Sequence, residues 1–372
     1  MVIRELKLDG FRNLAETPLD FSEKGHLIIG DNAQGKTNLL EAIYYLTLLK
    51  SFRSRNDREC ICFDKKGFSV RGKWIDDRGQ IENMVVGYDG RRKKAVLSGN
   101  EKKKVSEALG IFKSVIFTPD DIAIVHGGPS RRRRYLDMVL SINSNVYLER
   151  LKRYKRALFS RNMLLKSNSA SDRVISLWEK EMAESGAHVV CKRVSYVRKI
   201  APIYEKLFFN LSSGERASIN YQSSLVGESG GSPDEGLDEN RLRDVLAERL
   251  VRKRSIERDR GVTLSGPQKD DLFFGVNGKP LRNYGSQGQK RTAVICLKMA
   301  EAEQIKLSNG VQPVLLMDDI FSGLDQKRAG KLLEELVERH QSFITAPRRE
   351  AVFEQLGHLA IKTIERGVVR DG

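Results

Sequence analysis

The chain has 372 residues, enough for two or three domains that each bury a hydrophobic core. Lysine and arginine number 65 against 49 aspartates and glutamates, and the net charge of +16 favours polyanionic partners, either nucleic acid or an anionic membrane face. The four cysteines lack metal-ligand spacing, and no apolar run is long enough for a membrane-spanning helix. We therefore expect a cytoplasmic protein with reduced cysteines.

Strand patterns and one helix pattern fill the first 125 residues. Residues 2–8 alternate between apolar and polar side chains, which is typical of a strand rather than a signal peptide, and residues 17–21 predict the return strand. A buried strand over residues 26–30 is followed by a glycine-containing loop and a helix to about Lys50. Further strands are predicted at 68–75, 81–88, 94–98 and 114–117.

The loop after the strand at 26–30 fits the phosphate-loop pattern G-x-x-x-x-G-K-[ST]. Glycines allow backbone N–H groups to turn toward phosphates, and the helix N-terminus adds partial positive charge. Lys36 is expected to reach the β- and γ-phosphates of ATP, and the Thr37 hydroxyl to hold Mg²⁺. The predicted nucleotide-binding residues of this loop are Gly30, Asp31, Asn32, Ala33, Gln34, Gly35, Lys36, Thr37 and Asn38.

Residues 126–260 differ in character and predict a compact, largely helical insertion. Apolar residues recur at helical intervals from Arg131, and a second helical stretch covers 171–211 with a break near Pro202. A strand is predicted at 217–222 and another charged helical stretch at 237–260. No internal repeat or sustained heptad pattern is present, which argues against an extended coiled coil.

The last segment, 261–372, supplies the acidic residues that a phosphate loop needs. A hairpin is predicted around Asn277, then a helix at 287–307 and a buried strand at 314–317 that ends in Asp318 and Asp319. We expect Asp318 to hold Mg²⁺ or its water, and Asp319 to act as the water-activating base. A helix at 326–339, a strand at 342–345, a short helix and a strand at 359–364 complete the prediction.

Two further segments flank the acidic strand. The sequence GSQGQ at 285–289 precedes it by one helix, and SGLD at 322–325 follows it. This order resembles the ABC-type ATPases and, within them, the head domains of the SMC-like group. The resemblance implies that Ser286, with Gly288 and Gln289, meets the γ-phosphate held by the other protomer of a dimer. A plain helix cap is the alternative. Thr345 stands where transporter-type ATPases carry a switch histidine, although it has no titratable group.

Several motifs together narrow the resemblance. FRN at 11–13, KSFR at 50–53, TPDD at 118–121, a GxPxxRRxxLD-like run at 127–137, GPQKDDLFF from 266 and YGSQGQKRT from 284 are similar to the RecF family of bacterial recombination-mediator ATPases. The match extends over nearly the whole chain. The family pattern expects GPHRDD where this chain has GPQKDD, and most ABC enzymes carry glutamate at the position of Asp319. That shorter acid predicts slow hydrolysis.

The resemblance implies an α/β fold: an ABC-type P-loop ATPase head with a largely helical inserted arm domain. It also implies an ATP-dependent homodimer that binds duplex DNA, hydrolyses ATP weakly with DNA stimulation, and helps to load the recombinase at gaps through RecR and RecO. Arg12 and Asn13 would contact a phosphate or the adenine, with a surface turn as the alternative. Asp120 or Asp121 would occupy the γ-phosphate-sensing loop, again with a plain turn as the alternative.

Basic residues are dispersed along the chain without a base-reading motif. The runs lie at 93–94, 102–104, 131–134, 152–156 and 252–254. Together they predict sequence-independent contact with DNA phosphates. Two competing interpretations are the nucleotide-binding subunit of an ABC transporter and a chromosome-organising head. The charge and the wide split of the ATPase motifs disfavour the first, and the short insertion without heptads disfavours the second.

Overall fold

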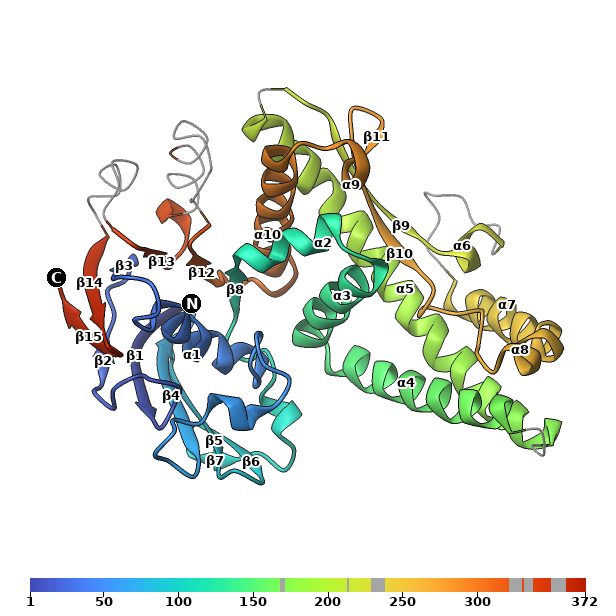
Figure 1. Ribbon diagram of the computed structural model, residues 1–372, viewed down its shortest axis with the longest axis horizontal. Helices are drawn as coiled ribbons and strands as arrows, with labels where there is room; N and C mark the ends of the chain where they lie inside the picture. The colour runs from blue at the N-terminus through green and yellow to red at the C-terminus, as the bar shows by residue number, and fades with distance from the viewer. Residues whose placement is uncertain (168–170, 213, 229–237, 321–329, 331–336, 349–358) are drawn as a thin grey trace. The chain divides into compact units, whose positions relative to one another are not determined.

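The computed structural model describes the chain except for residues 168–170, 213, 229–237, 321–329, 331–336 and 349–358 (Figure 1). It divides into two compact units. The head unit comprises residues 1–122, 210–214 and 291–372, and the arm unit comprises residues 123–209 and 215–290. The sequence placed the insertion at 126–260. The arm unit begins close to the expected position but continues to residue 290. That extension contains the GPQKDD and GSQGQ segments.

A largely parallel sheet forms one layer of the head unit. Its order is β15-β14-β3-β13-β12-β8, and all pairs are parallel except β14 with β15. The three inner strands that the order places between β14 and β8 are apolar and almost wholly buried, as parallel strands covered on both faces must be. The strands are β3 (Gly25–Ile29), β8 (Ser114–Phe117), β12 (Val314–Asp318), β13 (Ser342–Ala346), β14 (Ala360–Glu365) and β15 (Val368–Asp371).

An antiparallel sheet forms the second layer of the head unit, in the order β2-β1-β4-β5-β6-β7. Buried and more exposed residues alternate along β4, as expected where one face of a sheet covers a core. The strands predicted at 68–75 and 81–88 are confirmed, and the third is shifted by one residue. The sheet contains β1 (Val2–Asp9), β2 (Leu19–Asp20), β4 (Phe68–Ile75), β5 (Ile81–Tyr88), β6 (Lys93–Leu97) and β7 (Asn100–Glu101).

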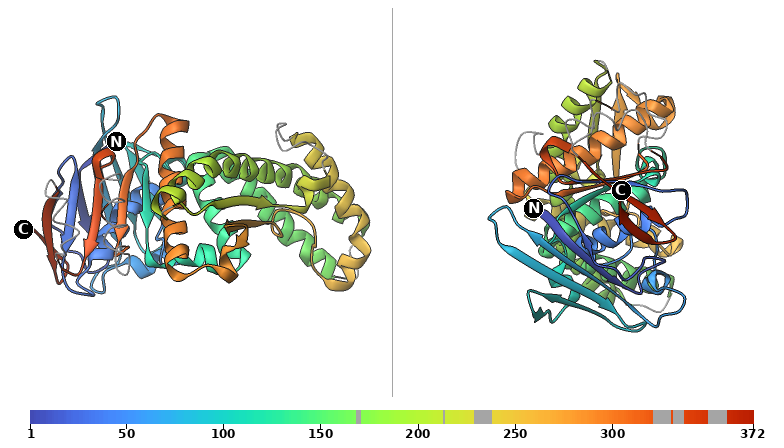
Figure 2. Two further views of the ribbon diagram at one scale, coloured as in Figure 1. Left: turned by 90° about the horizontal axis from the view of Figure 1, so that it is seen from above. Right: turned by 90° about the vertical axis from the view of Figure 1, so that its left-hand side faces the viewer.

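Helix α1 (Lys36–Leu48) contacts strands of both sheets, namely β4 and β5 of one and β8, β12 and β13 of the other. A helix enclosed in this way must be apolar nearly all round, and the leucine, isoleucine and tyrosine side chains from Leu39 to Leu48 are buried. Short 3₁₀ turns lie at Asp57–Cys60, Val105–Ala108 and Pro119–Asp121. Figure 2 shows the strands of the head unit from two further directions.

The arm unit consists of helices and a small sheet of order β11-β10-β9. A cluster of buried residues from α4, α5, α6 and α7, including Tyr154, Met182 and Leu246, forms its core. The helices and strands are α2 (Ile122–His126), α3 (Pro129–Asn143), α4 (Asn145–Lys166), α5 (Asp172–Leu211), β9 (Ala217–Gln222), α6 (Ser224–Glu228), α7 (Glu239–Arg252), α8 (Arg254–Arg260), β10 (Asp271–Val276), β11 (Lys279–Pro280), α9 (Leu281–Tyr284) and α10 (Gln287–Asn309). Helix α10 starts in this unit and continues into the head unit.

One expectation for the arm was wrong. The sequence predicted a break near Pro202, whereas α5 continues through it as one 40-residue helix. Proline removes a helix hydrogen bond and disfavours the interior of a helix. Here Ile200 and Tyr204 on either side are fully buried, and the Tyr204 ring packs 6.1 Å from that of Phe274 on β10. Tertiary packing therefore maintains the helix across the proline.

Buried charge networks fix the GPQKDD segment within the arm unit. Arg193 donates to the Pro267 carbonyl (2.9 Å) and to Asp137 (2.7 Å). Tyr221 donates to Asp270 at 2.6 Å, and Tyr154 donates to Gln268. Because these partners are satisfied inside the arm unit, they account for the acidic and glutamine positions of this segment without a ligand.

Candidate nucleotide site

The phosphate loop, residues 30–35, joins β3 to α1 in the head unit. At Gly30 a Cβ atom would lie 2.4 Å from the backbone oxygen of Ile364, so a larger residue cannot fit without movement. Gly35 has φ 118°, and a Cβ there would lie 3.1 Å from Asn13 Oδ1. Both positions therefore require glycine, and the loop leads directly into the N-terminus of α1, where backbone N–H groups favour an anion.

Lys36 lies at this N-terminus and is nearly buried, with 9% of its surface exposed. Its Nζ donates to the carbonyl oxygens of Asp31 (2.8 Å) and Gly30. Burial lowers the pKa of Lys36, and the negative charges of Asp319, Asp318 and Asp31 partly oppose that shift. The ammonium group is thus held inside the loop by two carbonyl partners, at the place where phosphate oxygens are expected.

Thr37 and Asp318 come together from opposite ends of the sequence. The Thr37 hydroxyl lies 3.0 and 2.9 Å from the two carboxylate oxygens of Asp318, at the end of β12. A hydroxyl and a carboxylate beside a phosphate site suit Mg²⁺, which takes one or two protein oxygens and completes its shell with water and phosphate oxygens. The described residues contain no group of three or more histidine, cysteine or acidic side chains that could hold a metal ion. The pair would suit Mg²⁺ bound together with the phosphates of ATP, with Thr37 and Asp318 as the protein residues that would hold it.

Asp319, the predicted base, follows directly and is exposed. Its backbone has φ 47°, in the left-handed region that only glycine, asparagine and aspartate visit readily. Its N–H donates to Thr345 Oγ1 at 3.0 Å, and the Thr345 hydroxyl also lies 2.9 Å from Asp318 Oδ1. Thr345 therefore contacts both acidic residues.

Asn13 and Gln34 brace the phosphate loop from outside. Asn13 accepts a hydrogen bond from Asn38 (2.7 Å) and donates to the Gln34 carbonyl (3.4 Å). Gln34 in turn accepts from the backbone N–H groups of Arg366 (2.6 Å) and Gly367 (2.9 Å), in the turn between β14 and β15. Asn13 thus lies beside the loop, as the sequence predicted, and a nucleotide contact from it stays a prediction.

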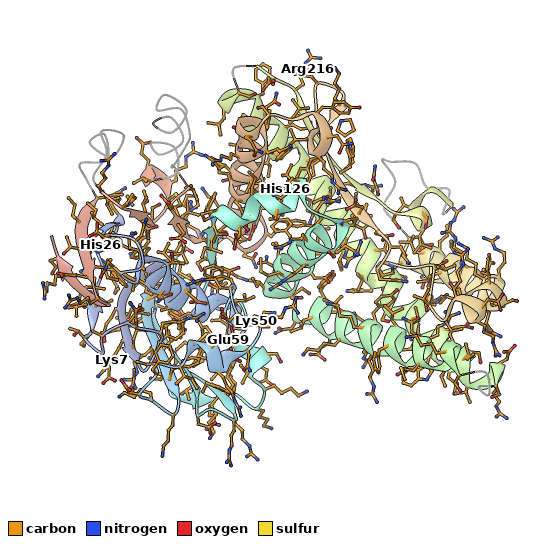
Figure 3. All side chains as sticks on the ribbon, in the orientation of Figure 1. Lys7, His26, Lys50, Glu59, His126 and Arg216 are labelled. Atoms are coloured by element: carbon orange, nitrogen blue, oxygen red, sulfur yellow. The ribbon has the colours of Figure 1, made fainter. Side chains whose placement is uncertain are left out.

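Arg12 makes protein contacts in the structure. Its Nε and Nη2 atoms pair with the two carboxylate oxygens of buried Glu41 at 2.9 and 3.0 Å, and Nη2 also donates to Ser54. Its Nη1 atom donates to the carbonyl of Glu59 at 2.6 Å, a residue that Figure 3 labels in the head unit. These contacts favour a structural role for Arg12, and its proposed contact with phosphate or adenine remains a prediction.

The GSQGQ turn lies at the end of the arm unit and caps α10. Ser286 Oγ accepts from the Gln289 N–H (3.1 Å), and Gln289 Oε1 accepts from the Ser286 N–H (2.8 Å), which is a reciprocal capping box. Gln289 also donates to Glu215 at 2.6 Å. Ser286 is exposed, whereas Gly288 and Gln289 are half-buried. The turn is therefore a helix cap by structure, and its contact with a γ-phosphate stays a prediction.

The acidic residues of the TPDD segment differ in their surroundings. Asp121 closes a capping box with Thr118, accepting from its N–H at 2.7 Å, while Asp120 is exposed. The SGLD segment, Ser322–Asp325, lies outside the described residues. The sequence did not reveal Glu41, because an acid within an apolar helix pattern gives no signal of its arginine partner.

The matches with known proteins extend over nearly the whole chain, as the motifs do. Residues 2–369 match the family described as "RecF/RecN/SMC N terminal domain". A protein of Halalkalibacterium halodurans named "DNA replication and repair protein RecF" is 36% identical over 375 aligned positions, covering 100% of this chain and 99% of its own. The chain belongs to the RecF family. Proteins of the same name in Bacillus subtilis and Symbiobacterium thermophilum are 37% and 38% identical over 93% of this chain.

Solved RecF structures agree with this assignment. The "recombination mediator protein RecF-ATP in RecFOR pathway" aligns with a TM-score of 0.89 at 35% identity, covering 100% of this chain and 97% of that one. The corresponding ATPrS structure gives the same TM-score over 99% of this chain. An Smc head bound to a ScpA domain has a TM-score of 0.58 at 16% identity, which shows a shared fold. The expected α/β ABC-type head with a helical insert is thus confirmed.

The basic runs of this chain are not equally exposed. Arg132 is 4% exposed and pairs with Asp271 at 2.6 Å, and Arg133 donates to the Asp270 carbonyl. Arg254 pairs with Glu179. The basic residues that the structure leaves exposed within the predicted runs are Lys94, Lys103, Lys104, Arg131, Arg134, Lys152, Arg153, Lys155, Arg156 and Arg252. No helix among the described residues has the length and apolarity to cross a membrane.

Proposed function

We propose that this RecF-family protein is an ATP-dependent DNA-binding protein of recombinational repair and replication restart. It forms an ATP-induced homodimer on duplex DNA, hydrolyses ATP slowly, and helps to load the recombinase at gaps. The observation that carries the proposal is the approach of Thr37 to Asp318 beside the glycine loop and Lys36, within a chain that matches RecF proteins end to end. RecR, together with RecO, is the proposed protein partner.

Residues of the head unit and of the GSQGQ turn have separate proposed roles at the nucleotide. Backbone N–H groups of residues 30–38 and the Lys36 ammonium bind and orient the phosphates. Thr37 and Asp318 would hold Mg²⁺, which neutralises charge on the phosphate oxygens when bound. Asp319 orients the attacking water and accepts its proton. Ser286, with Gly288 and Gln289, is proposed to complete the site of the partner protomer by placing the N-terminus of α10 near its γ-phosphate.

Contact with DNA is proposed to be electrostatic and independent of sequence. Exposed lysines and arginines on α3, α4 and β6 supply positive charge, while Arg132 and Arg254 are engaged by acids and contribute less. The net charge of +16 supports attraction to the phosphate backbone. Arg131, Arg134, Arg153 and Arg156 are therefore the first arginines to test.

The deciding experiment measures binding of a fluorescent duplex of arbitrary sequence by the full chain with ATP and Mg²⁺, with ADP, and without nucleotide. Binding should strengthen with ATP and be accompanied by dimer formation. Lys36→Ala should lose the ATP-dependent increment, while Lys7→Ala, which removes the same charge from an exposed site on β1 (Figure 3), should retain it. Equal binding in all three nucleotide states would overturn the proposal. The transporter alternative predicts no duplex binding.

A further inference from the structure

Thr345 lies in the strand next to the acidic residues of the nucleotide site. Strand β13 pairs in parallel with β12, and in this register Thr345 is opposite Asp318. The threonine is 1% exposed, so water does not compete for its hydroxyl. The Thr345 hydroxyl is thereby placed within hydrogen-bond distance of Asp318, the proposed magnesium ligand.

The single hydroxyl of Thr345 serves both acidic residues at once. It donates to Asp318 Oδ1 at 2.9 Å and accepts the backbone N–H of Asp319 at 3.0 Å. The Met317 carbonyl, at 3.5 Å, is a weaker alternative acceptor for the same proton. Because a hydroxyl has one proton and two lone pairs, donation to the carboxylate and acceptance from the N–H are compatible.

Each of these contacts removes a specific freedom. Rotation about the last bond of an aspartate is broad, so the plane of the Asp318 carboxylate is fixed by its partners, Thr37 and Thr345. Asp319 has φ 47°, a left-handed conformation that aspartate tolerates, and its N–H is paired with the Thr345 hydroxyl. The Thr345 hydroxyl orients the first acid and holds the turn that carries the second.

We propose that Thr345 is a positioning residue: its hydroxyl sets the Asp318 carboxylate for Mg²⁺ and fixes the turn that presents Asp319. This inference rests on the proposed function, since it assumes a Mg²⁺–ATP site. It does not require Thr345 to touch ATP or the metal. Outer partners of metal ligands typically change metal affinity by 10–100-fold when they are removed.

The test compares Thr345→Val, which keeps the shape but removes the hydroxyl, with Thr345→Ser, which keeps the hydroxyl. Affinity for a fluorescent ATP analogue is measured with EDTA and across a Mg²⁺ titration. We expect Thr345→Val to bind the analogue normally in EDTA but to need at least about tenfold more Mg²⁺ for the metal-dependent gain. Thr345→Ser should stay within about threefold of the parent, because removal of only a methyl group leaves the hydrogen bonds in place.

Thr47→Val is the matched control. Thr47 is also fully buried, and its hydroxyl lies 2.6 Å from Ser114 Oγ in the same head unit. Its loss should lower the melting temperature without changing the Mg²⁺ titration. Should Thr345→Val fail to fold, Thr345→Ala replaces it with the same expectation.

Three results would overturn the proposal for Thr345. They are an unchanged Mg²⁺ requirement in Thr345→Val, a serine variant that behaves like valine, or a shift of equal size in Thr47→Val. Failure of the parent protein to bind the analogue at all would instead refute the proposed nucleotide site. Failure of ATP to strengthen duplex binding would refute the proposed DNA function and leave this inference standing.

Discussion

Replacement of Asp319 tests whether a short acid limits ATP turnover. Aspartate lacks one methylene of glutamate, so its carboxylate is about 1.5 Å short of where a glutamate would hold the attacking water, and a misplacement of about 1 Å can cost on the order of 100-fold in rate. Asp319→Glu should therefore raise turnover by up to about 100-fold. A cavity of about 180 Å³ beside Asp319, lined also by Thr118 and Arg291, leaves space for the longer chain.

Asp319→Asn provides the matched loss of charge. Asparagine has the same length and tolerates the left-handed backbone at φ 47°, so the turn should stay intact. Glutamate tolerates that conformation less well and should lower the melting temperature of the head unit by a few degrees, since 1 kcal/mol corresponds to about 2–4 °C for a unit of about 150–250 residues.

Turnover is measured by phosphate release, and dimer lifetime by an ATP chase. We expect Asp319→Asn to abolish the remaining turnover and to keep the dimer closed. If the asparagine variant turns over ATP and opens as fast as the parent, Asp319 is not the base. If only the glutamate variant shows no gain, side-chain length is not the limiting factor.

Three other substitutions test separate parts of the site, and a salt titration tests the contact with DNA. Lys36→Ala should abolish ATP binding and ATP-dependent dimerisation with an unchanged circular dichroism spectrum; retained affinity in a fluorescence assay would place the phosphates elsewhere. Asp318→Asn should weaken the Mg²⁺ dependence of ATP binding while affinity in EDTA persists, and an unaltered Mg²⁺ titration would remove it from the metal site. Ser286→Arg should bind ATP but sediment as a monomer, and a normal dimer would exclude Ser286 from the interface. Duplex affinity should fall with salt at a log–log slope of about −0.9 per phosphate contact, and a marked sequence preference at fixed salt would contradict phosphate readout.

Local patterns predicted much of the head unit correctly. The strand, loop and helix around Gly30–Lys36 are typical of a phosphate loop, and apolar runs of strand length marked β8, β12 and β13 within one residue. The reason is physical: a buried parallel strand must be apolar on both faces, and a phosphate loop needs glycine at fixed places. The β14 strand was also predicted, whereas β15 was not, because Val368–Asp371 is short and largely exposed.

Contacts between distant segments could not be predicted from the pattern alone. Pairing of Arg12 with Glu41, or of Thr345 with Asp318, depends on strand order and on the register between β12 and β13. Prediction from local sequence has the same limit in the arm unit. Pro202 predicts a helix break, but it lies within a packed 40-residue helix. Sequence spacing predicts which elements form, and tertiary packing then determines which side chains meet.

The residues proposed to bind ATP are held by several protein contacts, whereas the residue proposed to hydrolyse it is exposed. Lys36 and Thr37 are fixed by partners within the head unit, and Asn13 and Gln34 brace the loop around them. The proposed base, in contrast, is a short, exposed side chain on a left-handed turn whose N–H donates to the Thr345 hydroxyl. With the slow hydrolysis that we propose, an ATP-bound dimer would stay closed until the reaction is complete. Such a site would suit the proposed clamp, whose release from DNA is timed by hydrolysis, because the residue proposed to set the rate differs from those proposed to bind the phosphates.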